Sequence, residues 1–199
     1  MDIAAMRPLR KVKRLTLHRA LKIGYLRNER KQSKRLKRFG YRIDNELTTG
    51  NYLTAYNPVT NKVIFVDNGT NPTSVRDLYT DVAGIGAGRL TSTSRYKTDY
   101  TAYLKAKEKY KDVPVTLVGH SLAGSLVSEM AQTGDRAIAY GAPYTKKKEN
   151  VYSYRTAGDP FAVFNSNART LPNPAGLVER LNPIQPHNVA NLADKAIFV

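Results

Sequence analysis

The 199-residue sequence contains no cysteine and no tryptophan, and its acidic residues number half its basic ones. Without cysteine, neither a disulfide framework nor a thiolate metal site can form, and the redox compartment is not constrained. No apolar run approaches the roughly 20 residues of a membrane span, and no apolar segment typical of a secretory signal follows the basic start. The length suits one α/β domain with a substantial core rather than two domains.

The net charge of +16 is unevenly distributed along the chain. Residues 1–42 hold 15 of the 32 lysines and arginines, with only Asp2 and Glu29 against them. We therefore place a boundary near Gly40, between a basic N-terminal arm (residues 1–40) and a nearly neutral body (residues 41–199). A helix over about residues 15–38 of the arm would carry an apolar stripe on one side, made of Leu17, Ala20, Leu21 and Tyr25.

The most informative stretch is residues 117–124, Leu-Val-Gly-His-Ser-Leu-Ala-Gly. A glycine two residues before a serine, with small residues after it, permits a sharp turn from strand to helix that presents the serine as a nucleophile at the sheet edge. Ser121 fits this pattern, with Ala123 at the usual glycine position and Gly124 next. A serine that caps a helix at a tight turn is the alternative interpretation.

The sequence around Ser121 favours the nucleophile. Residues 113–118 form a short apolar, β-branched run, which is typical of a buried parallel strand. After Ser121, large apolar residues recur at helical spacing, at Leu122, Leu126 and Met130. A strand, a sharp turn and a helix therefore surround the serine in the required order.

The rest of the body alternates strands with helices. A β-hairpin is predicted for 51–57 and 62–66, a helix from Tyr96 to Tyr110, and strands at 137–140 and 151–154, while 160–186 is expected to be irregular. Such alternation predicts a mostly parallel sheet with helices on both faces, an α/β-hydrolase-like fold.

A serine hydroxyl is a poor nucleophile at neutral pH and needs an adjacent base. The chain has three histidines. His18 lies in the arm, and the sharp turn should point His120 away from Ser121, so His187 remains as the base. The alternative for His187 is a surface histidine near the start of a helix.

The base needs a partner that orients its imidazole. Asp159 follows the strand predicted at 151–154 and gives the order Ser, Asp, His that is expected for this fold. Gly-Asp-Pro at 158–160 is equally suited to cap a helix, and both roles could hold together. Asp194 and Glu179 are weaker rivals, because neither follows a strand.

Acyl transfer also requires two donors for the developing oxyanion. One would be the backbone N–H of Leu122. The other should come from the loop Asp67-Asn68-Gly69-Thr70, which follows the strand at 63–66.

Five segments of the sequence, in this order, resemble the class 3 (fungal-type) lipases over about residues 43–194. They are VIFVDNGTNPTSVRDLYTDV, VTLVGHSLAGSL, AIAYGAPY, YRTAGDPFAVF and PHNVANL. The resemblance implies a triad of Ser121, Asp159 and His187, with Thr70 and Leu122 as the oxyanion hole. It also implies hydrolysis of acylglycerol or phospholipid esters without a metal or cofactor. The alternative is a non-catalytic, basic membrane- or nucleic-acid-binding protein on the same fold.

The arm has several interpretations: a solvated tail, a nucleic-acid arm, a targeting presequence or a membrane-docking helix. Nucleic-acid phosphates need only the charge, whereas an interfacial helix needs an apolar face as well. The apolar stripe therefore favours docking to an anionic membrane. We accordingly expect removal of residues 1–40 to leave hydrolysis of a soluble ester unchanged.

Overall fold

The computed structural model describes residues 13–68, 89–173, 187–189, 192 and 197–199. Within these residues, seven strands form one sheet in chain order. The first three strands are antiparallel neighbours, and every later strand is parallel to the one before it. The strands are β1 (Arg42–Ile43), β2 (Tyr52–Asn57), β3 (Lys62–Asp67), β4 (Val115–His120), β5 (Arg136–Tyr140), β6 (Val151–Thr156) and β7 (Ala168–Leu171).

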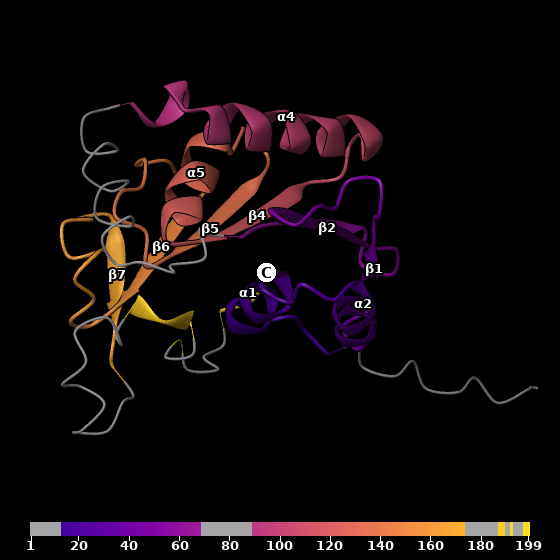
Figure 1. Cartoon of the computed structure of the whole chain (residues 1–199), viewed down its shortest axis with the longest axis horizontal. Coiled ribbons are helices and arrows are strands. Elements are labelled where there is room, and N and C mark those ends of the chain that lie inside the picture. Colours follow the sequence, from indigo (N-terminus) through magenta and orange to yellow (C-terminus); the bar gives the residue numbers. More distant parts are fainter. Residues whose placement is uncertain (1–12, 69–88, 174–186, 190–191, 193–196) are drawn as a thin grey trace, which may run out of the picture.

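Helices cover both faces of this sheet (Figure 1). On one face lie α1 (Leu17–Gly24) and α2 (Glu29–Lys37); on the other lie α4 (Ser94–Lys109) and α5 (Leu122–Met130), with the short 3-10 turn η1 (Leu90–Ser92) before α4. A mostly parallel sheet between two helical layers confirms the predicted α/β-hydrolase-like fold class.

The predicted hairpin and the predicted strands around it are found in place. β2 and β3 pair from Tyr52 with Asp67 to Asn57 with Lys62, and the side chain of Asn57 accepts hydrogen bonds from the N–H groups of Val59 and Thr60 in the turn. The expectation of irregular structure throughout 160–186 is wrong at β7. This edge strand has no buried residue and no apolar alternation, so its sequence carried no strand pattern.

The helical expectation for the arm needs correction in two respects. The single helix over residues 15–38 is instead two helices, because α1 ends at Gly24, with Tyr25 as its C-cap, and the side chain of Asn28 starts α2 by accepting from the Lys31 N–H. The apolar stripe does not face outward either. Leu17, Ala20 and Leu21 are at most 1% exposed and pack on the sheet.

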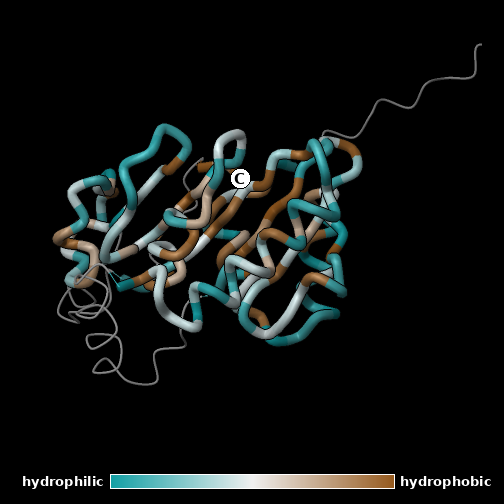
Figure 2. Tube along the Cα trace, turned by 90° about the horizontal axis from the view of Figure 1, so that it is seen from above, coloured by the Kyte–Doolittle hydropathy of each residue, from teal (hydrophilic) through white to brown (hydrophobic). Residues whose placement is uncertain are grey.

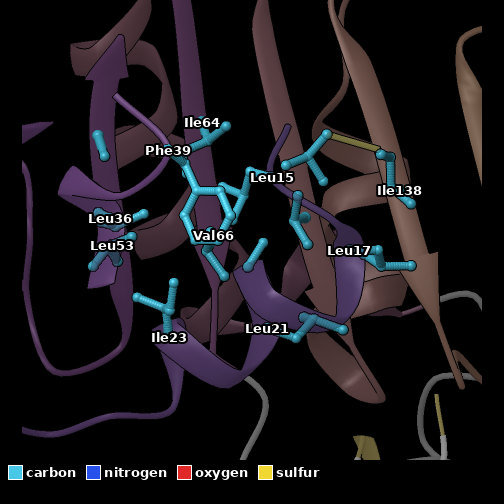
Figure 3. Close-up of a cluster of buried hydrophobic side chains, with 14 of the residues drawn as sticks. Leu15, Leu17, Leu21, Ile23, Leu36, Phe39, Leu53, Ile64, Val66 and Ile138 are labelled. Atoms are coloured by element: carbon cyan, nitrogen blue, oxygen red, sulfur yellow. The ribbon is translucent and has the colours of Figure 1, made fainter. Parts of the chain in front are cut away.

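Figure 3 shows how the α1–α2 layer joins the core: Leu17 and Leu21 of α1 and Leu36 of α2 belong to one buried cluster with Leu53, Ile64, Val66 and Ile138 of the sheet. Gly24 lets α1 approach β3 closely, since a Cβ there would collide with Asn68 and Val66. The charge boundary near Gly40 therefore does not mark a break in the packing. Apolar residues concentrate along the strands, while the outer helical surfaces are hydrophilic (Figure 2).

Candidate active site

Ser121 occupies the turn between β4 and α5. Its φ of 58° and ψ of −129° lie in a region that non-glycine residues seldom adopt, at a cost of about 1–3 kcal/mol. Gly119 makes the turn feasible, because a Cβ there would collide with the Ala123 carbonyl. Gly124, one position beyond the usual glycine, lets α5 approach β5, where a Cβ would lie 2.9 Å from that of Ala142.

The structure brings Ser121, His187 and Asp159 together at the carboxyl ends of the parallel strands. Ser121 Oγ lies 2.9 Å from His187 Nε2, and His187 Nδ1 lies 3.0 and 3.1 Å from the two carboxylate oxygens of Asp159. All three residues are buried. Because an ionised carboxylate only accepts, Nδ1 carries the proton and Nε2 is left to accept from the Ser121 hydroxyl.

The structure also bears on the non-catalytic interpretations of these three residues, namely helix caps at Ser121 and Asp159 and a surface position for His187. The side chain of Ser121 makes no capping hydrogen bond to α5, so the N-cap interpretation fails for it. Asp159 faces His187 and also closes a turn, since its Oδ1 accepts from the N–H groups of Phe161 and Ala162. No helix follows it at 160–164, so the helix-cap interpretation is wrong. His187 is buried rather than on the surface. The rivals Asp194 and Glu179 lie outside the described residues.

The ring of His120 makes hydrogen bonds to Tyr25 and to the main chain of His187, and none to the Ser121 hydroxyl. Its Nδ1 lies 2.9 Å from the hydroxyl of Tyr25, and its Nε2 lies 2.8 Å from the main-chain oxygen of His187. Burial, and secondarily the nearby His187, lower the pKa of His120 to about 3. His120 is therefore neutral at physiological pH, and His187 is the imidazole that reaches Ser121.

Of the two predicted oxyanion donors, the structure describes one. The N–H of Leu122 opens the first turn of α5, where helical N–H groups have no partner in the helix, and it donates no hydrogen bond within the described part of the chain. Thr70 lies outside the described residues. The chain leading to it is described as far as Asn68, whose carbonyl accepts from Arg95 Nη2 at 2.8 Å.

Arg95 also ties α4 to the end of β3. It forms ion pairs with Asp67, at 2.6 Å, and with Asp99. Burial raises the pKa of both carboxyl groups, and the charge of Asp99 raises that of Asp67 further. No local sequence pattern marks this cluster, because Asp67 ends β3 whereas Arg95 and Asp99 lie in α4.

Gly141 is a second residue that sequence reasoning missed. It follows β5 with a φ of +60°, and a Cβ on it would lie 3.1 Å from His187 Nδ1 and 3.2 Å from Asp159 Oδ2. Its place directly after a strand, in the segment AIAYGAPY, was the available signal. Because Gly141 has no side chain, the His187 ring and the Asp159 carboxylate can pack directly against its main chain.

Among the residues that the structure describes, no group of three or more metal-ligating side chains occurs, and no helix is long and apolar enough to cross a bilayer.

No protein-family model and no curated protein matches this sequence. One solved structure that is similar to it is a triacylglycerol lipase from Penicillium expansum, at 15% identity and a TM-score of 0.36. The alignment covers 79% of this chain and 67% of that chain. A likeness of this size defines neither the family nor the activity, which must be argued from the site itself.

Proposed function

We propose that the protein is a serine hydrolase that cleaves carboxylic esters of lipids, in the lipase, phospholipase and esterase class. One observation carries the proposal: the buried, hydrogen-bonded chain from Ser121 Oγ through the His187 ring to Asp159. The order of the five sequence segments adds support for a relationship to the class 3 lipases.

The chemistry follows from the positions of the protons. His187 Nε2 takes the proton of Ser121 Oγ while Oγ bonds to the ester carbonyl carbon, whose π electrons move to the carbonyl oxygen. Asp159 holds Nδ1–H and stabilises the imidazolium. When the tetrahedral intermediate collapses, the C–O bond to the alcohol breaks and Nε2 returns the proton to the leaving oxygen. Water then repeats the sequence on the acyl-enzyme.

The developing oxyanion would accept from the Leu122 N–H at the start of α5, where the helix dipole also favours negative charge. We assign the second donor to Thr70 from the resemblance alone. In this scheme Ser121, Asp159 and His187 carry out the covalent and proton-transfer steps. The chemistry requires no metal or organic cofactor.

A lipid substrate is favoured by apolar side chains beside the site. The ring centroid of the buried Phe161 lies 4.5 Å from that of His187, and Val163 and Phe164, two and three residues later, are 51% and 89% exposed. The side chain of Asn165 holds this loop by donating to the carbonyl of Ala142. Ala142 belongs to the loop after β5, and in that loop, two residues later, lies Tyr144, which is 44% exposed. These three side chains could contact the acyl chain or the lipid surface.

The test is a substrate panel of p-nitrophenyl esters, triacylglycerols and phospholipids, with Ser121→Ala as the blank. We expect hydrolysis of at least one lipid ester that the blank lacks. If the wild type and Ser121→Ala are equally inactive on every ester, the non-catalytic alternative replaces the proposal.

A further inference from the structure

A second hydrogen-bonded chain reaches His187 from its main-chain side. It runs from the hydroxyl of Tyr25, at the end of α1, through the ring of His120 to the carbonyl oxygen of His187. A carbonyl only accepts, so His120 Nε2 must carry the proton of the neutral ring. The other ring nitrogen, Nδ1, then accepts from the Tyr25 hydroxyl. Geometry alone therefore fixes the tautomer of His120.

The ring of His120 is closely confined. It is stacked on Tyr140 at a centroid distance of 5.6 Å and lies 4.8 Å from the ring of His187, while the Tyr25 ring meets its edge at 5.9 Å. Tyr25, Tyr140 and His187 are the titratable groups that face it from α1, β5 and the His187 segment. Because these neighbours restrict the His120 ring, its Nε2–H can hold the carbonyl oxygen of His187 in one position.

We infer that His120 and Tyr25 are positioning residues for His187, setting the main chain from which its imidazole reaches Ser121. In the described part of the chain, the bond from His120 is the one hydrogen bond that holds the His187 main chain. The kinetic consequence rests on the proposed function. Misplacement of a catalytic group by about 1 Å can cost ~10²-fold in rate, so the N-terminal helix contributes to catalysis without touching substrate.

The kinetic test compares variants that keep or lose the donor. His120→Gln can still place an N–H near the Nε2 position, whereas His120→Met has similar bulk and no donor. We expect His120→Met and Tyr25→Phe to lower kcat by roughly 10- to 100-fold with KM for a soluble ester unchanged, and His120→Gln to recover much of the loss.

Tyr110→Phe is the matched control, because its hydroxyl donates to Asp44 far from the site at 2.7 Å. A merely structural role predicts similar effects of Tyr25→Phe and Tyr110→Phe on melting temperature and none on kcat. If His120→Met keeps wild-type kcat, the positioning role is overturned.

A second readout does not depend on hydrolysis. Long-range ¹⁵N–¹H NMR of the histidine rings should show His120 as the neutral Nε2–H tautomer, and Tyr25→Phe should shift its Nδ1 signal. An Nδ1–H tautomer would overturn the inference even if the enzyme is active. The expected tautomer in a protein without esterase activity would instead refute the proposed function alone.

A different observation concerns the outer surface of α1, α2 and their flanks. All twelve lysines and arginines of residues 13–42 are exposed, and Glu29 is the one acidic residue in that range. We call this surface the basic face. In the part of the chain that the structure describes, no ion pair involves the bases of α2. The α2 part of this surface is therefore dense in positive charge that no ion pair among the described residues neutralises.

The apolar side of these helices is already used, because it is buried in the core. None of the large exposed hydrophobic residues of the described chain lies within 13–42. A membrane-docking helix needs an apolar face to insert, whereas a phosphodiester backbone needs only positive charge. We propose that the basic face binds the phosphate backbone of nucleic acid, in addition to the ester hydrolase function.

The test uses fluorescence anisotropy of a labelled single-stranded oligonucleotide of about 20 nucleotides, titrated between about 50 and 200 mM salt. Lys31/Lys34/Lys37→Gln removes three charges from α2. Lys97/Lys105/Lys111→Gln removes three exposed lysines from α4 and the residues just after it, on the opposite layer. We expect the α2 variant to weaken binding and to lower the slope of log K against log salt by about 2, with little effect of the control.

Vesicles of phosphatidylglycerol and phosphatidylcholine provide the other arm of the test. Binding of the oligonucleotide that is tighter than vesicle binding at physiological salt supports the proposal. Vesicle binding without oligonucleotide binding, or equal effects of the two triple variants, overturns it.

Discussion

At the scale of single residues, the candidate site depends on a glycine as much as on its reactive side chains. Gly141 has a left-handed φ, and a methyl group on it would press against the His187–Asp159 pair. Gly134 provides a matched control, because it too has a positive φ, of +86°, but a Cβ on it would meet nothing within 4 Å.

We predict that Gly141→Ala lowers kcat for a soluble ester by roughly 10- to 100-fold through displacement of His187. Gly134→Ala should carry a similar backbone strain of about 1 kcal/mol and leave kcat unchanged. Equal kcat values for the two variants in steady-state assays, after matching for folded protein, would contradict the packing argument.

His120 predicts a pH dependence of stability. Its pKa is about 3 in the folded protein and near 6.5 when unfolded, so between these values the unfolded state binds more protons. Stability should therefore fall as the pH drops from about 6.5 toward 3, by up to ~1.4 kcal/mol per pH unit. Urea denaturation at pH 7 and pH 5 should show a smaller loss for His120→Gln than for the wild type. The same loss in both proteins would refute the assignment.

At the scale of elements, the α1–α2 layer is part of the core although its sequence is the most basic in the chain. Residues 13–40 contribute seven buried apolar side chains to the cluster under the sheet: Leu15, Leu17, Ala20, Leu21, Ile23, Leu36 and Phe39. Each large one stabilises the fold by about 1.5–3 kcal/mol, and their sum is comparable to the whole stability of a domain, about 5–15 kcal/mol.

Removal of residues 1–40 should therefore abolish folding, contrary to what the charge pattern suggested. Leu21→Ala should lower the free energy of unfolding by about 2–5 kcal/mol. Leu104→Ala on α4, where the side chain is 39% exposed, should change it by less than about 0.5 kcal/mol. Circular dichroism and urea denaturation measure both. A folded, ester-cleaving 41–199 fragment would show that the layer is dispensable.

Periodicity predicted most elements and could not predict what covers them. The stripe of Leu17 and Leu21 correctly indicated a helix with one apolar side, but a stripe of this kind suits a sheet as well as a membrane. The Tyr25–His120 contact joins residues 95 positions apart, and no local pattern encodes it. The sequence could predict that Ser121, Asp159 and His187 lie together, because a serine nucleophile needs a base and an orienting carboxylate in this order. Their catalytic role stays a prediction.

At the scale of the whole molecule, two functions are assigned to two surfaces. The candidate active site lies at the carboxyl ends of the parallel strands. The basic face is the outer surface of the α1–α2 layer, which covers one face of the sheet. The Tyr25–His120 chain connects the two, since it starts at the end of α1 and ends at His187. The basic residues and the candidate catalytic residues are thus far apart in the sequence and are joined through this hydrogen-bonded chain in the fold.

The most direct test of the central claim is covalent labelling of Ser121 by a fluorophosphonate, located by peptide mass spectrometry. The account predicts one adduct, on Ser121, that forms slowly or not at all in His187→Ala, and a loss of ester hydrolysis of ~10⁴-fold or more in Ser121→Ala. A correctly folded wild-type protein that stays unlabelled, or labelling at another serine, would contradict it.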